Sequence, residues 1–219
     1  MTLTLLDLYN DCALQEWSMY DSGVTTTSEM ESSLVLALNK ALTEIIYSYP
    51  FKFRERTHID FTYAGVEAYE MPFGLIMKDK SGDYKVTLNG KKLRLIDKPS
   101  ELEPKCGFPE GFYIKRDEII LYPTPCSKFI LSIDYYTLAL GEDSNGEEIL
   151  KLSNANDKVD VPEHLEEILK QAVISRAMLS TISSEGDENF SAYKKQSETA
   201  YRQLVKYSKG WWQDKSVKI

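Results

Sequence analysis

The chain has 219 residues, of which 42% are hydrophobic and 27% are charged, and its formal net charge is −8. A globular chain of this length can bury roughly 70% of its unfolded surface, so it needs no disulfides or metal ions to support a core. The composition excludes a collagen-like or intrinsically disordered chain.

The first fifty residues have the periodicity of two helices. Apolar residues recur at spacings of three and four: Leu5, Leu8 and Cys12 in the first run, and Leu34, Leu38, Ala41 and Ile45 in the second. Pro50 ends the second helix, because proline disfavours the α conformation in the preceding residue and has no N–H to donate.

The apolar period then changes from 3.6 to two. Between Phe51 and Tyr63 most odd positions carry aromatic or apolar residues, whereas the even positions are polar or charged. This alternation predicts a long strand with one wet face, formed by the even positions.

Two hairpins and a last strand are predicted in the middle of the chain. Asn89-Gly90 separates two alternating segments and favours a type I′ turn, because both residues tolerate positive φ. In GFYIKRDEIILYPTP, residues 111–125, two apolar runs flank Arg116-Asp117. With a strand over 129–136, these segments indicate an antiparallel sandwich or barrel-like domain.

The remainder is predicted to be a polar loop followed by two helices. Residues 141–159 are rich in turn-forming residues, which predicts a surface loop or linker. Pro162 suits the first turn of a helix. A last helix carries an apolar stripe for packing lengthwise on its neighbour. The stripes are Leu165, Ile168, Leu169, Ala172 and Val173, then Phe190, Tyr193, Ser197, Ala200, Leu204, Tyr207 and Trp211.

We therefore expect an α+β fold. The N- and C-terminal helices, residues 1–50 and 160–219, form a helical bundle, and residues 51–140 form the central β-rich domain. Residues 141–159 connect the two.

Cysteine usage and hydropathy suggest a protein made and kept in the cytoplasm. Cys12, Cys106 and Cys126 are odd in number and lack a C-x-x-C spacing, which predicts reduced, buried thiols rather than disulfides or a zinc site. The N-terminus lacks the basic region of a signal peptide, and no apolar run is long enough to span a membrane.

No catalytic, cofactor or metal site is predicted. His58 and His164 have no positioned partner nearby in sequence. Residues 89–92 lack the magnesium-binding Ser or Thr of a phosphate loop, and a calcium loop over 143–146 would lack its required carboxylates. Acidic pairs such as Glu147-Glu148 leave a carboxylate-dependent glycan hydrolase as an alternative.

The charge is unevenly distributed. The segment from Lys194 to Ile219 holds seven basic and two acidic residues, a net charge of +5, which leaves −13 for the rest. An acidic body disfavours nucleic-acid wrapping, because phosphate binding requires a basic surface. The basic segment is either a solvated helix face or a docking end for a partner.

Aromatic residues favour the docking interpretation near the C-terminus. The chain has 14 tyrosines and a Trp211-Trp212 pair. Tyr and Trp are enriched where protein surfaces meet, because they bury much area and keep a polar group. Gly210 is expected to end the last helix. The candidate partner-binding residues are Lys209, Trp211, Trp212, Lys215, Lys218 and Ile219.

Four motifs occur in a specific order: Tyr49-Pro50-Phe51, residues 65–72, 109–125 and 161–173. This succession resembles the head-to-tail adaptor proteins of tailed bacteriophages, also called connector, tail tubular or ring proteins. The likeness covers roughly residues 28–208, and its specificity lies in the order and spacing of the motifs. Residues 73–105 and 141–160 match no part of the family pattern.

The resemblance implies a structural virion protein rather than an enzyme, assembled in the host cytoplasm and placed at the head–tail junction. It implies a ring homo-oligomer, commonly a dodecamer, that binds the portal protein and the next tail protein, a nozzle or tail tube. The C-terminal segment often inserts into the portal in such proteins. DNA would pass through the channel during genome ejection without specific binding, which suits an acidic lumen. Another virion or host binding module stays open as an alternative, beside the hydrolase.

Overall fold

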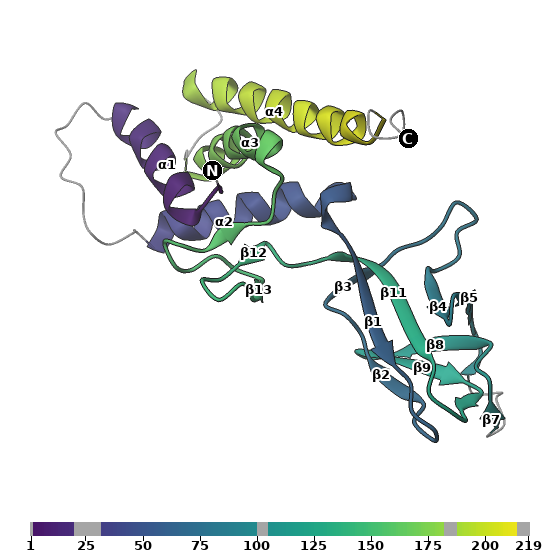
Figure 1. The fold of residues 1–219 in the computed structure, drawn as a ribbon. Helices are drawn as coiled ribbons and strands as arrows, with labels where there is room; N and C mark the ends of the chain where they lie inside the picture. The colour runs from purple at the N-terminus through teal and green to yellow at the C-terminus, as the bar shows by residue number, and fades with distance from the viewer. Residues whose placement is uncertain (1, 20–31, 100–104, 182–187, 214–219) are drawn as a thin grey trace. The chain divides into compact units, whose positions relative to one another are not determined.

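The computed structural model describes residues 2–19, 32–99, 105–181 and 188–213, with the backbone alone at 15–19, 181, 188 and 209–213. The fold is α+β, with mostly antiparallel sheets, and it divides into two units (Figure 1). The helical unit comprises residues 1–53 and 139–219, and the β-rich unit comprises residues 54–138. Among the described residues, no helix combines the length and apolar character that a membrane span requires.

The described part of the helical unit is built around α3, which packs against the three other α-helices. A short 3-10 helix, η3, leads directly into α3. The bounds are α1 (Leu5–Met19), α2 (Ser32–Tyr47), η3 (Glu163–Leu165), α3 (Glu166–Thr181) and α4 (Glu188–Gln213).

The predicted stripes form most of the core of this unit. Those of the first two helices and most of that of α3 are buried. On α4, Ser197, Ala200 and Leu204 are buried, but Tyr207 is 52% exposed and Ser208 is buried in its place. The stripe shifts by one residue because a straight α-helix drifts relative to a strict seven-residue repeat.

The predicted end of the last helix at Gly210 is wrong. The helix α4 continues to Gln213. Glycine lowers helix stability by about 1 kcal/mol relative to alanine but does not break the hydrogen-bond ladder, so the neighbouring residues keep it helical.

Residues 141–159, expected to be a polar loop or linker, instead contain three short strands of the helical unit. These are β12 (Gly141–Glu142), β13 (Glu148–Ile149) and β14 (Lys158–Val159), in the order β13-β12-β14. Leu152 and Val159 are buried in the core of the unit. The side-chain amide of Asn39 on α2 donates to the carbonyl of Leu152 and accepts from its N–H, both at 2.9 Å. A few apolar residues and one amide thus anchor a polar segment.

The β-rich unit contains two larger sheets. The five-stranded sheet has the order β1-β11-β4-β5, with β3 also paired to β11, and the four-stranded sheet has the order β2-β9-β8-β6. The strands of the first are β1 (Glu55–Phe61), β3 (Gly74–Ile76), β4 (Val86–Leu88), β5 (Lys91–Lys92) and β11 (Ile130–Thr137). Those of the second are β2 (Ala68–Glu70), β6 (Arg94–Leu95), β8 (Gly111–Lys115) and β9 (Glu118–Tyr122).

Both predicted hairpins are present. Asn89 and Gly90 have φ of 47° and 76° between β4 and β5, the positive values that a type I′ turn requires. The strands β8 and β9 pair as an antiparallel hairpin, with Phe112 opposite Leu121, and Arg116 in the turn has a φ of 57°.

The two sheets contribute to one core. It is formed by Tyr69, Val86, Leu88, Leu93, Phe112, Ile119, Leu121, Leu131 and Ile133. The expected closure into a sandwich or barrel is not shown among the described strands: neither sheet closes into a barrel, because its end strands do not pair with each other.

The thiols are free, as expected, but only one is buried. Cys12 lies in the core of the helical unit, whereas Cys106 and Cys126 are exposed. Cys106 begins β7 (Cys106–Gly107), which pairs in parallel with β10 (Thr124–Pro125). Cys126 directly follows β10. This two-residue pairing is too short to cover its side chains.

Candidate interaction surface

Strand β1 has the predicted alternation, but its faces are the reverse of those expected. Directly opposite residues of an antiparallel pair lie on the same face. His58 lies opposite Ile133 and Asp60 opposite Leu131, and both β11 residues are fully buried in the core. The polar positions of β1 are therefore on the inner face, and the apolar positions are on the outer face.

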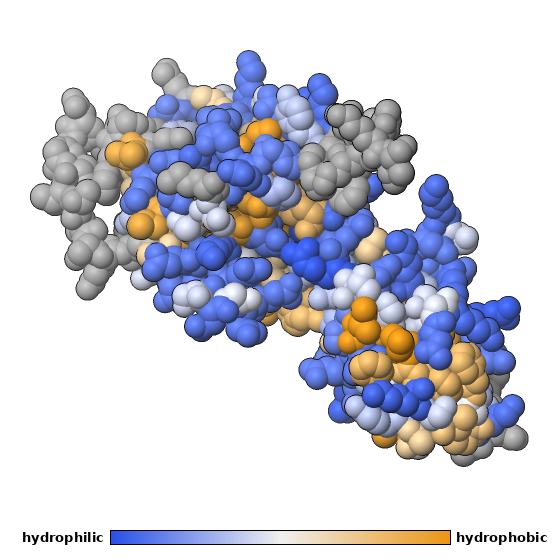
Figure 2. All heavy atoms as spheres, in the orientation of Figure 1, coloured by the Kyte–Doolittle hydropathy of each residue, from blue (hydrophilic) through white to orange (hydrophobic). Residues whose placement is uncertain are grey.

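The outer face of the five-stranded sheet carries large exposed apolar side chains. Ile59 is 63% exposed and Phe61 is 43% exposed, and Ile130, opposite Phe61, is 47% exposed. Leu75 of β3 is 62% exposed and lies on the same face, because it pairs with Tyr136 of β11. We call Ile59, Phe61, Leu75 and Ile130 the outer apolar face. Figure 2 shows apolar residues gathered in the region where Figure 1 draws β1 and β11.

The register that exposes these residues is fixed by a buried threonine. Thr62 is 0% exposed, and its N–H donates to the carbonyl of Phe129 at 2.9 Å. The N–H of Phe129 donates in turn to Oγ1 of Thr62 at 2.9 Å. A slip by one residue would turn every β1 side chain to the opposite face, and this reciprocal contact opposes such a slip. The exposure of the outer apolar face is therefore a specified feature.

The inner face of β1 carries charged and polar side chains. Arg56, His58 and Asp60 are only half-buried there. The strand β1 is at one edge of its sheet, and inward-pointing charged side chains are a recognised device that keeps an edge strand from pairing with other chains. The edge of β1 is thus protected against pairing with another strand, whereas its outer apolar face is accessible to a partner.

Polar and charged groups of both signs lie among these apolar side chains, because the pair of Thr57 and Asp134 stands between the position of Ile59 and that of Leu75. The hydroxyl of Thr57 donates to Oδ1 of Asp134 at 2.8 Å, and Nζ of Lys85 lies 3.8 Å from Oδ2 of Asp134. Nζ of Lys128 lies 4.0 Å from the ring centroid of Phe61, within the range of a cation–π contact.

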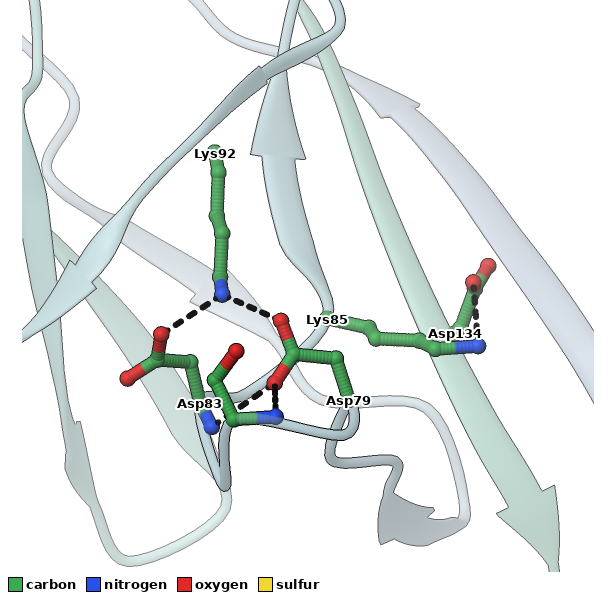
Figure 3. A network of polar contacts seen from close by, with 6 residues as sticks. Asp79, Asp83, Lys85, Lys92 and Asp134 are labelled. Atoms are coloured by element: carbon green, nitrogen blue, oxygen red, sulfur yellow. Dashed lines mark hydrogen bonds and ion pairs between the residues drawn. The ribbon is translucent and has the colours of Figure 1, made fainter.

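A network of ion pairs fixes the loop before β4 onto β5 (Figure 3). Nζ of Lys92 lies 2.5 Å from Oδ2 of Asp79 and 2.8 Å from Oδ2 of Asp83. The other carboxylate oxygen of Asp79 accepts from the N–H groups of Ser81 and Asp83. The hydrogen bond to Lys92 lowers the pKa of Asp79, and the same contact raises the pKa of Lys92. This network shapes the sheet on the side away from β1.

The sequence-predicted docking residues lie elsewhere. Lys209, Trp211 and Trp212 are in the last turns of α4, where only the backbone is described. Lys215, Lys218 and Ile219 lie outside the described residues.

The residues considered for chemistry are not assembled into a site in the described part of the chain. His58 is half-buried on β1, and His164 is exposed on η3. Glu147 is exposed at the turn before β13, and Glu148 is exposed at the first position of that strand. Within the described ranges, no group of three or more His, Cys, Asp or Glu side chains could hold a metal ion.

Sequence reasoning missed the outer apolar face because alternation marks two faces without saying which is inside. The usable signal was the type of polar residue. The polar positions of β1 include an arginine, a histidine and an aspartate, and charged side chains that point inward are typical of edge strands.

Comparison of the sequence with models of known protein families and with curated proteins found no match.

Proposed function

We propose that this chain is a structural protein that assembles through its surfaces, and that it serves as a head-to-tail adaptor of a tailed bacteriophage. In this proposal, copies of the chain form a ring, commonly a dodecamer in similar proteins, beneath the portal of the virion. The ring extends the DNA channel toward the tail. The observation that carries the proposal is the outer apolar face.

The physical basis is the cost of exposing apolar surface. Burying a large aliphatic or aromatic side chain contributes about 1.5–3 kcal/mol, so four such residues on one face represent a large unused stabilisation in the isolated chain. Monomeric proteins rarely expose contiguous apolar patches, and larger ones mark interaction sites. A rigid sheet face with a locked register suits a permanent contact better than a transient one.

The order of the sequence motifs indicates which assembly this surface serves. The segments at 49–51, 65–72, 109–125 and 161–173 follow the succession of the adaptor proteins. The β-rich unit would act as a sandwich-like block that presents its outer faces to neighbours, since its two sheets share one core. The helical unit would form the bundle that meets the portal.

The unequal charge supports the same function. Outside the basic C-terminal segment, the chain carries a net charge of −13, which disfavours retention of DNA in a channel. The basic segment, with Trp211 and Trp212, would dock into the portal, and the β-rich unit would meet the next tail protein.

The direct test uses the full chain and the portal protein encoded by the same genome. Negative-stain images of the purified mixture should show an extra ring of density on the portal. Mass spectrometry of purified virions should find the chain at a copy number that matches the portal ring. A host or accessory binding module would not follow portal stoichiometry, and absence of both the complex and the virion copies would overturn the proposal.

A further inference from the structure

We infer that the contact between neighbouring copies is made by the β-rich unit through its outer apolar face, so that the occupant of this face is a second copy of the chain. The inference rests on the proposed function in one respect, since it assigns a surface to the self-association which that function requires. It goes beyond the function by excluding the helical unit as the main contact between copies.

The distribution of charge between the units separates them as self-association surfaces. Residues 54–138 contain 13 basic and 13 acidic side chains, a net charge of zero. The other residues contain 13 basic and 21 acidic side chains, so the whole charge of −8 belongs to the helical unit. Identical surfaces of high net charge repel each other, whereas a net charge near zero favours association. Copies can therefore approach through their β-rich units without that penalty.

The charged groups near the outer apolar face also favour a protein partner of balanced charge. Lys85, Lys128 and Asp134 place both signs beside and between its apolar side chains. Nucleic acid or an anionic membrane would require a predominantly basic margin. Apolar side chains interspersed with charges of both signs suit a protein partner that also carries both signs.

The mode of contact follows from the strand order. The charged residues on the inner side of β1 oppose strand addition at its edge. The outer apolar face of the sheet is still available for contact. Ile59 is its most exposed side chain, at 63%, and lies directly opposite Ser132. A large side chain with little cover in the isolated chain is a natural anchor in a contact.

The test measures self-association of the full chain by sedimentation, over the widest concentration range that solubility allows. We expect the unaltered protein to associate reversibly, and Ile59→Lys to weaken that association by about tenfold or more. Ile59→Thr keeps a β-branched side chain and removes apolar area, so it should weaken association without disturbing the strand. Leu36→Lys is the matched control, because Leu36 on α2 of the helical unit is 61% exposed, and it should leave association unchanged.

Far-UV circular dichroism and thermal midpoints establish that each variant is folded. A protein that stays monomeric at every concentration, or an Ile59→Lys variant that associates like the unaltered chain, overturns the inference. An effect of Leu36→Lys as large as that of Ile59→Lys overturns it too.

A mixing experiment separates this inference from the proposed function. If the outer apolar face contacts its own copy, mixing Ile59→Lys with Ile59→Glu should restore association through opposite charges. Such a two-fold contact closes into a dimer, which supports the assigned surface but contradicts a ring. If each variant alone is impaired and mixing does not restore association, the outer apolar face contacts a different surface of the neighbouring copy, as a ring requires. Both the inference and the proposed function are then supported. Portal binding without any self-association would leave the function and remove the inference.

Discussion

The buried amide of Asn39 offers the sharpest test of how the helical unit is held together. Its side chain is 6% exposed, and Nδ2 donates to the carbonyls of Val35 and Leu152, each at 2.9 Å. Oδ1 accepts from the N–H of Leu152, also at 2.9 Å. Asn39→Ala removes all three bonds at once. Because Leu152 is 1% exposed, water does not readily replace them.

The expected destabilisation follows from the groups left without partners. Each buried backbone donor or acceptor that loses its partner costs about 1–3 kcal/mol. The N–H and carbonyl of Leu152 are both affected, and the better helix propensity of alanine recovers about 0.5 kcal/mol. The free energy of unfolding of the helical unit should therefore fall by about 1.5–5.5 kcal/mol.

Urea unfolding followed by circular dichroism at 222 nm measures this change, because all the described α-helices belong to that unit. Asn39→Asp is a second variant that keeps the volume of the side chain. It keeps an acceptor for the N–H of Leu152 but turns a carboxylate oxygen toward two carbonyls, so it should be no more stable than Asn39→Ala. Lys40→Ala, at an exposed position of the same helix, should change stability by less than about 0.5 kcal/mol. If Asn39→Ala behaves like this control, the amide does not anchor the segment.

Three further predictions concern the stability of the two units and binding to the portal. Gly141→Ala should destabilise the helical unit by about 3 kcal/mol in the same urea assay, because the new Cβ would lie 1.9 Å from the carbonyl oxygen of Lys158. An unchanged stability would show that the two backbone segments are not in such close contact. Lys92→Met should lower the urea midpoint of the β-rich unit at neutral pH. That difference should shrink as the pH falls below 3.8, where Asp79, whose pKa is lowered in the folded state, finally protonates, and also above 10.5, where Lys92 begins to lose its proton. A difference independent of pH would show that the pair contributes by packing alone. Truncation after Gly210 should preserve the thermal midpoint yet weaken portal binding in a pull-down; unfolding would mean that the removed residues belong to the core.

Local sequence was sufficient wherever one short-range cause decided the structure. Asn89-Gly90 set its turn because few other residue pairs adopt two consecutive positive φ values at low cost. The stripes of the helices were readable because a helix of this kind has one buried side and its period is fixed at 3.6 residues. For the same reason Leu204 could be placed in the core from spacing alone.

Local sequence was insufficient where the outcome depended on a distant segment. In residues 141–159 the polar composition correctly indicated many turns, but the segment is ordered onto the helices by Asn39, more than a hundred residues earlier in the chain. Residue spacing does not reveal such a partner. The extension of α4 past Gly210 has a related cause, since glycine weakens a helix without dictating where it ends.

The sequence by itself determined the α+β character of this protein, the positions of its hairpins and the alternation of β1, because these depend on backbone preferences over a few residues. Only the tertiary structure decided which face of β1 is inside. The period of a strand is two, so both assignments satisfy the same pattern. The choice was made by the pairing of β1 with β11, whose buried Leu131 and Ile133 lie opposite Asp60 and His58 and leave the apolar face of β1 exposed.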